Sequence, residues 1–145
     1  MNSYEILLET RVFLEQKKEL PAKNLKWLIA GIDGYLDDGA AFEKTLGLND
    51  ARFEYLITAR DKHLINALRA VQGNLSDWKS CLALSSIISR FKTGRWKKIR
   101  YLVEPPDNLS PVNKNLFYAL KTGLDVPESA HQIRNILVKS KSYTI

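Results

Sequence analysis

The sequence has little of what marks a secreted, membrane-spanning or fibrous protein. Its one cysteine, Cys81, cannot form an internal disulfide, which favours a reducing compartment. No apolar run approaches the roughly 20 residues that span a bilayer, because the longest, residues 27–32, has six. Only 7 glycines and 5 prolines occur in 145 residues, too few for a collagen-like or low-complexity chain. Glu5 and Glu9 precede the first basic residue, so the N-terminus does not resemble a secretory signal. We therefore expect a cytoplasmic protein with no membrane partner.

Residues that commonly form catalytic or metal centres are also scarce. There are only two histidines, His63 and His131, and no glycine-rich phosphate loop, paired-cysteine metal site or His-Glu-x-x-His run. We expect no enzyme activity, no cofactor and no bound metal. One alternative is an enzyme whose site is assembled from scattered residues such as Arg60, Asp61 and His63. Cys81 lies among apolar residues of a predicted helix and is expected to be a small buried hydrophobe.

What the sequence does contain favours helices. Leucine and alanine together number 32, whereas valine and threonine, which prefer strands, number only 12. With 45% hydrophobic residues, a chain of this length can bury the core of one ordinary domain. We predict an all-α fold: a single compact domain of seven or eight helices over residues 1–139, followed by a loose tail at 140–145. The loop at 104–110, with its two prolines, is the best place for a subdomain boundary.

Capping residues and helical spacing mark the individual helices. Asn2 and Glu5 form a candidate capping box for the first helix, and Ser76 and Ser110 are candidate N-caps of two later ones. The predicted helices cover about residues 2–18, 22–38, 50–71, 77–93, 111–122 and 127–139. Six apolar residues share one face of the second of these helices: Leu25, Leu28, Ile29, Ile32, Tyr35 and Leu36.

Residues 95–103 are compatible with two structures. As a helix, the segment aligns Trp96, Ile99 and Val103 on one side. As an extended segment, it places Ile99, Tyr101 and Val103 on a common face. We favour the helix, because no second strand is evident to pair with an extended segment.

The positive charge is concentrated in the second half of the chain. Residues 1–72 contain 10 Lys and Arg against 11 Asp and Glu, a net charge of −1, whereas residues 73–145 contain 12 against 5, a net charge of +7. No acid lies between Asp77 and Glu104. Clustered cations repel one another, which favours an anionic partner. Half of the twelve fall within residues 90–100: Arg90, Lys92, Arg95, Lys97, Lys98 and Arg100.

Two functions fit this basic segment. In the first, a non-catalytic protein binds DNA or RNA, its cations contacting phosphates while exposed aromatic residues stack on unpaired bases. In the second, a helical interaction module binds an acidic protein surface, with Trp96 as its central contact. A structural interpretation stands beside both, in which Phe91, Trp96 and Ile99 face the core and the cations are merely solvated. Trp96, between two cations, is the tryptophan expected at the surface. The candidate binding residues are Arg90, Lys92, Arg95, Trp96, Lys97, Lys98 and Arg100.

Residues 42–56 resemble a helix-turn-helix motif. Gly47 takes the place of the turn residue, and apolar residues such as Phe53 take the places of anchors in the second helix. Glu43 departs from the pattern, because that position is usually a small buried residue. Carboxylates such as Asp50 at the start of the second helix would be repelled by phosphates. We therefore interpret this segment as a helix-turn-helix-like structural corner.

Overall fold

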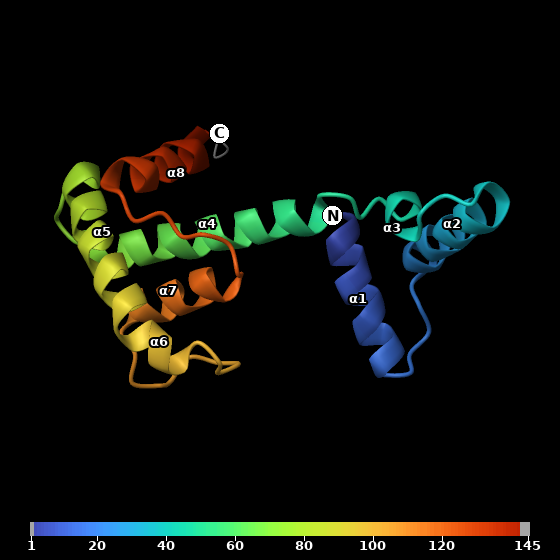
Figure 1. Ribbon diagram of the computed structural model, residues 1–145, viewed down its shortest axis with the longest axis horizontal. Helices are drawn as coiled ribbons and strands as arrows, with labels where there is room; N and C mark the ends of the chain where they lie inside the picture. Colours follow the sequence, from blue (N-terminus) through green and yellow to red (C-terminus); the bar gives the residue numbers. More distant parts are fainter. Residues whose placement is uncertain (1, 143–145) are drawn as a thin grey trace. The chain divides into compact units, whose positions relative to one another are not determined.

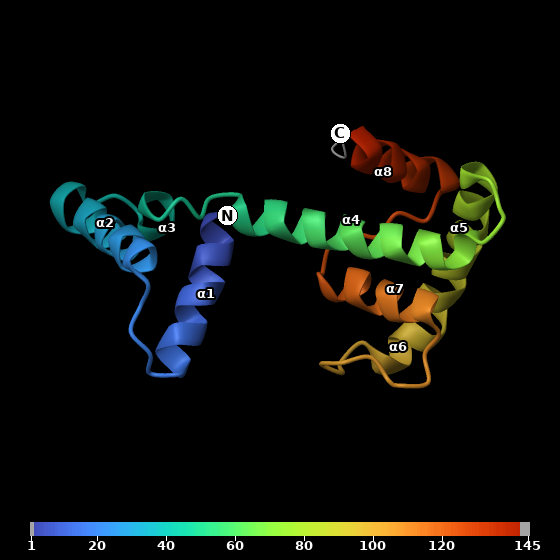
Figure 2. The ribbon, with the colours of Figure 1, turned by 180° about the vertical axis from the view of Figure 1, so that it is seen from behind.

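The computed structural model describes residues 2–142, and within them the chain is helical without any strand (Figures 1 and 2). This confirms the predicted all-α fold. The six longer helices lie where capping and spacing predict them. The helices are α1 (Ser3–Glu15), α2 (Ala22–Asp38), α3 (Phe42–Thr45), α4 (Ala51–Gln72), α5 (Asp77–Thr93), α6 (Arg95–Ile99), α7 (Pro111–Lys121) and α8 (Ala130–Ser142).

The chain divides into two compact units, residues 1–56 (unit 1) and residues 57–145 (unit 2), with the division inside α4. Unit 1 contains 7 Lys and Arg against 10 Asp and Glu, a net charge of −3, and unit 2 contains 15 against 6, a net charge of +9. The structural division therefore separates the charges more sharply than the midpoint of the sequence does. The loop at 104–110 lies within unit 2, and the single domain over residues 1–139 stays a prediction.

In unit 1, polar contacts fix the ends and faces of α1 and α2. The predicted capping box is confirmed: Asn2 Oδ1 accepts a hydrogen bond from the backbone N–H of Glu5, and Glu5 Oε2 accepts one from the backbone N–H of Asn2, both at 3.0 Å. The buried Asn24 of α2 donates its Nδ2 to Thr10 Oγ1 of α1 at 3.1 Å. Trp27 Nε1 donates to the backbone carbonyl of Leu46 at 3.0 Å, which ties α2 to the residue that follows α3.

Two glycines let α2 approach α3 closely. A Cβ added at Gly31 would lie 2.2 Å from Leu46 Cδ2, and one added at Gly34 would lie 2.6 Å from Thr45 Cγ2. Thr45 Oγ1 also donates to the carbonyl of Gly31 at 3.0 Å. The packed face of α2 is therefore the small-residue face. The apolar face that the spacing identifies points mostly to solvent, with Leu25, Ile29, Ile32, Tyr35 and Leu36 all exposed.

We expect Gly31→Ala to destabilise unit 1 by about 1–3 kcal/mol, because the new methyl group overlaps the Leu46 side chain. In a Leu46→Ala background the same substitution should cost nothing or stabilise α2, since alanine favours a helix over glycine. Thermal unfolding followed by circular dichroism measures both effects. Equal losses in the two backgrounds would contradict the proposed contact.

Unit 2 encloses one hydrophobic core. In Figure 1, α8, the second half of α4 and α7 follow one another from top to bottom beside α5, and α6 continues from the lower end of α5. Side chains from α4, α5, α7 and α8 meet in this core. Among its fully buried members are Leu64 and Leu68 of α4, Leu84 and Ile88 of α5, Leu116 and Phe117 of α7, and Ile133 of α8.

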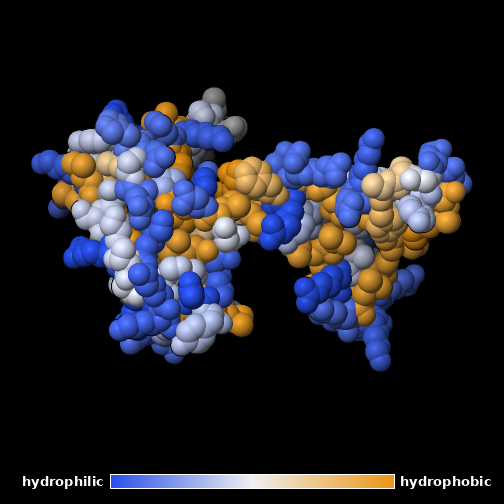
Figure 3. Space-filling model, viewed as in Figure 1, coloured by the Kyte–Doolittle hydropathy of each residue, from blue (hydrophilic) through white to orange (hydrophobic). Residues whose placement is uncertain are grey.

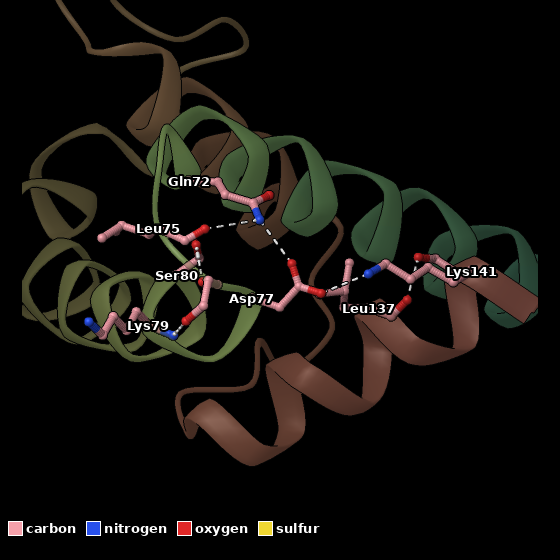
Figure 4. A network of polar contacts seen from close by, with 9 residues as sticks. Gln72, Leu75, Asp77, Lys79, Ser80, Leu137 and Lys141 are labelled. Carbon is pink, nitrogen blue, oxygen red and sulfur yellow. Dashed lines mark hydrogen bonds and ion pairs between the residues drawn. The ribbon is translucent and has the colours of Figure 1, made fainter.

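A polar network joins the start of α5 to the ends of α4 and α8 (Figure 4). Ser76 caps α5 as predicted, its Oγ accepting a hydrogen bond from the backbone N–H of Lys79. The Asp77 carboxylate accepts from Lys141 Nζ at 2.7 Å and from Gln72 Nε2 at 2.9 Å. These contacts, that of Lys141 above all, lower the pKa of Asp77 below its ordinary value. The network therefore connects the three helices through one carboxylate.

We expect Asp77→Asn to lower the melting temperature at pH 7, since an amide cannot form the ion pair with Lys141. The pKa of Asp77 is lower in the folded state than the value of about 3.9 usual for unfolded chains. Its contribution is therefore present above pH 4 and is lost as the pH falls through the folded-state pKa. The melting temperatures of the variant and the wild type should converge as the pH falls below the folded-state pKa of Asp77. A difference that does not shrink as the pH falls from 7 into the acid range would argue against this role.

Four boundaries differ from the predictions. The first helix ends at Glu15 rather than near Lys18, and Lys17 beyond it has a positive φ of 54°. The last helix begins at Ala130 rather than near Pro127, with Ser129 Oγ accepting from the backbone N–H of Gln132 at 3.2 Å. Residues 140–142 continue α8, where the ion pair of Lys141 with Asp77 holds the last turn, so they are not a loose tail. Residues 143–145 lie outside the described part of the chain. The segment 95–103 is helical only as far as Ile99.

Between residues 2 and 142, no helix combines the length and the apolar character that crossing a bilayer requires. The cytoplasmic location stays a prediction.

Candidate nucleic-acid interface

The predicted binding segment is the junction of α5 and α6. α5 ends at Thr93, and Gly94 turns the chain with its backbone N–H donating to the carbonyl of Arg90 at 3.0 Å. A Cβ at this position would lie 3.0 Å from the same carbonyl oxygen, so a larger residue would crowd the turn. α6 then begins with three cations and a tryptophan at residues 95–98, and it ends at the buried Ile99.

Apolar side chains hold this segment on the core of unit 2. Phe91 and Ile99 are buried. Trp96 is half-buried, with its ring 5.6 Å from that of Phe117 in an edge-to-face arrangement and 6.4 Å from that of Phe91. The expectation of a tryptophan free at the surface is therefore corrected. Trp96 and Ile99 are three residues apart on α6, so both turn toward the core.

Five of the predicted cations are exposed around this junction, and we call them the basic surface: Arg90, Arg95, Lys97, Lys98 and Arg100. Within residues 2–142, none of the five forms an ion pair with a carboxylate. Glu104, the first acid after them, accepts a hydrogen bond from Tyr118 Oη at 2.9 Å, which raises the pKa of the Tyr118 phenol. Figure 3 shows mainly hydrophilic residues over this end of unit 2. The basic surface therefore presents uncompensated positive charge.

Lys92 differs from the other six predicted residues. Its side chain is largely covered, and its Nζ lies 3.4 Å from Glu128 Oε1 and 3.9 Å from Asp125 Oδ1. These two acids come from the segment between α7 and α8. The charge of Lys92 is therefore already balanced within unit 2, and we leave this residue out of the basic surface.

Lys121 adds a cation that the sequence reasoning missed. At the end of α7, its Nζ donates to the backbone carbonyl of Arg100 at 2.7 Å. The same ammonium lies 5.8 Å from the centre of the Phe117 ring. Its position in the last turn of a predicted helix was visible in the sequence, but no local pattern connects it to residue 100.

A pocket of about 400 Å³ lies beside the basic surface and is open to solvent. Arg90 and Arg95 are among its lining residues, and Arg95 Nη2 donates a hydrogen bond to Asn108 Oδ1 at 2.7 Å. Guanidinium groups bind phosphates through paired hydrogen bonds. The remaining lining is mixed: Ile87, Phe91 and Val112 are apolar, whereas Ser110 and Asn113 are polar.

Tyr101 is the exposed aromatic residue of the segment. It lies two residues after the end of α6, next to the C-cap Arg100, and 76% of its surface is accessible. An exposed ring next to several cations can stack on an unpaired base. The sequence favours Trp96 as the exposed aromatic residue that stacks on a base, but in the structure Tyr101 is the one exposed for that role.

The helix-turn-helix-like corner is present but has a poor surface for DNA. α3 has only 4 residues, and Gly47 turns the chain with a positive φ of 69°. Phe53 is 53% exposed, so its expected role as an apolar anchor is wrong. The charged residues that line the pocket at this corner are Glu43, Asp50 and Arg52, two acids against one cation. Negative charge here agrees with the interpretation of a structural corner.

The scattered catalytic candidates are engaged in separate contacts. Arg60 Nη2 binds Asp61 Oδ1 at 2.7 Å, while His63 Nδ1 lies 3.4 Å from Asn115 Oδ1. Cys81 is fully buried, as expected, and burial first and the nearby Asp77 second raise the pKa of its thiol. No group of three or more potential metal ligands occurs among residues 2–142.

No family model matches this sequence, and no curated protein or solved structure is detectably similar to it.

Proposed function

We propose that this chain is a non-catalytic nucleic-acid-binding protein whose contact surface is the basic surface of unit 2. The observation that carries the proposal is that five neighbouring cations are exposed with no carboxylate partner among the described residues. Such a cluster is destabilised by its own repulsion unless an anion covers it. A nucleic acid supplies closely spaced phosphates, and its binding gains free energy from the release of counterions.

The pocket and Tyr101 support binding of an unpaired strand in particular. The two arginines that line the pocket suit one phosphate, and apolar lining residues such as Val112 suit part of a sugar or base. Tyr101 then offers its ring to a neighbouring base. A duplex would contact the same cations through its phosphates but could not use the ring in this way.

The experiment is a fluorescence-anisotropy titration of the full chain with a mixed-sequence 20-nucleotide strand and its duplex, at physiological salt. We expect dissociation constants in the range of about 1–100 µM, typical of contacts to the phosphate backbone. Tyr101→Ala should weaken binding of the single strand about tenfold and leave the duplex nearly unaffected. Tyr101→Phe, which keeps the ring, is the matched control and should bind as the wild type does.

A competition separates nucleic acid from an acidic protein surface as the ligand. Polyglutamate of equal total charge should displace the labelled strand poorly, because it has neither bases nor phosphates. If it displaces the strand equally well, an acidic protein surface becomes the better assignment. The absence of binding to either nucleic acid would overturn the proposal.

A further inference from the structure

The pocket beside the basic surface is lined by two arginines and by no carboxylate of the described chain, and we call it the arginine pocket. Its lining residues come from the last turns of α5, the start of α6 and the first turn of α7 with its cap. Its volume of about 400 Å³ is near the lower end of the range usual for small-molecule sites, about 300–1,000 Å³. Such a volume suits a group of the size of one nucleotide.

The charge at the pocket comes from Arg90 and Arg95, which stay protonated at physiological pH. Neither forms an ion pair with a carboxylate in the described part of the chain. Arg95 Nη2 donates to Asn108 Oδ1 at 2.7 Å, so a neutral amide positions this guanidinium and leaves its charge unbalanced. Two unbalanced positive charges therefore belong to the lining of one small pocket.

The rest of the lining suits a nucleoside that carries a phosphate. Ile87 and Phe91 are four residues apart on α5, so they lie on one face of the helix, and Val112 adds a third apolar side chain. Ser110 and Asn113 contribute a hydroxyl and an amide, which can donate hydrogen bonds to phosphate or sugar oxygens. The lining therefore combines apolar contacts for a sugar or base with polar groups for its substituents.

The end of a strand matches this charge better than its interior does. A phosphate within a strand is a diester with one negative charge, whereas a terminal phosphate is a monoester with a charge of about −1.5 to −2 at pH 7 and three acceptor oxygens. A diester would leave about one of the two arginine charges unbalanced. A monoester balances both, and its oxygens can accept hydrogen bonds from two guanidinium groups at once.

We propose that the arginine pocket binds a phosphomonoester, namely the phosphorylated end of a nucleic-acid strand. This inference rests on the proposed function, since Lys97, Lys98 and Arg100 of the basic surface then contact the phosphates that follow the end. The pocket selects the end of the strand, and the remaining cations bind the strand whatever its end.

The test compares single strands of about 8 nucleotides, close to the site size of one binding domain, in anisotropy titrations of the full chain without phosphate buffer. One sequence is used with hydroxyl groups at both ends, with a 5′-phosphate and with a 3′-phosphate, each labelled at the opposite end. One of the two phosphorylated strands should bind about tenfold more tightly than the hydroxyl strand. Methyl esterification of that terminal phosphate, which leaves one charge, should remove most of the gain.

Two double variants place the effect at the pocket. Arg90→Gln with Arg95→Gln should reduce the tenfold preference to less than about twofold. Lys97→Gln with Lys98→Gln removes the same charge from α6 at positions that do not line the pocket. It should weaken all strands by a similar factor and keep the tenfold preference. All four side chains are exposed, and circular dichroism checks that each variant is folded.

The outcomes separate this inference from the proposed function. If no strand binds, the proposed function fails. If all strands bind equally, or if the preference survives in the arginine variant, the basic surface stands and the end-binding pocket is excluded. Adenosine monophosphate tests a free nucleotide as the ligand: we expect it to compete only in large excess. Displacement of the phosphorylated strand at equal concentration would assign the pocket to a free nucleotide instead.

Discussion

Replacing Lys97, Lys98 and Arg100 together with alanine should weaken nucleic-acid binding about 100-fold in 0.1 M salt. Each phosphate contact makes the affinity depend on salt with a slope of about 0.7 to 0.9 in logarithmic units. Three contacts together therefore raise the affinity by about two to three powers of ten when the salt concentration falls from 1 M to 0.1 M. All three side chains are exposed and form no ion pair within residues 2–142, so their removal should leave unit 2 folded.

A charge-matched control separates this surface from the net charge of the chain. Lys62, Lys79 and Lys139 are also exposed in unit 2 and lie outside the basic surface. Their replacement by alanine lowers the net charge by the same three units, and we expect it to weaken binding less than about threefold. Anisotropy titrations of the wild type and the two triple variants give the comparison. Equal losses in the two variants would mean that the basic surface has no special role.

The largest expected effect on stability is that of Phe117→Ala. The Phe117 side chain is fully buried in α7, and its ring meets Trp96 of α6. Truncation of a buried phenylalanine costs about 3–5 kcal/mol through lost burial and the cavity left behind. That is a large part of the stability of an ordinary domain, about 5–15 kcal/mol. The variant should therefore open unit 2 far more often and release the support beneath the basic surface.

Cys81 provides the measurement for this variant. It is the single cysteine and is fully buried in α5, so a thiol reagent reaches it only when unit 2 opens. Phe117→Ala should raise the labelling rate by about 100-fold or more, and the exposed Val103→Ala should leave it nearly unchanged. Similar rates in the wild type and in Phe117→Ala would show that this ring is not central to the core.

The helices could be predicted because their signals are local. A capping box at Asn2 and Glu5, and serine caps at 76 and 110, each involve residues three positions apart. Such contacts depend on the chain nearby and on little else. The last turn of α8 was missed for the opposite reason, because Lys141 holds it through Asp77 at the start of another helix.

The faces of the helices were harder to predict than their positions. Spacing identifies the apolar face of α2, but the glycines at 31 and 34 decide which face meets α3. Spacing alone also left two interpretations for residues 90–100, and the structure divides the segment between them. Phe91, Trp96 and Ile99 turn to the core, while five cations turn outward. The pairing of Lys92 with Asp125 and Glu128 depends on a distant segment, so no local pattern could reveal it.

The central claim, that the basic surface contacts phosphates, is tested most directly by the slope of log affinity against log salt concentration. For one single strand, this slope should be shallower by about 2 for the Lys97, Lys98 and Arg100 triple alanine variant than for the wild type. The charge-matched triple variant should keep the wild-type slope. Parallel lines for the wild type and the basic-surface variant would contradict the account.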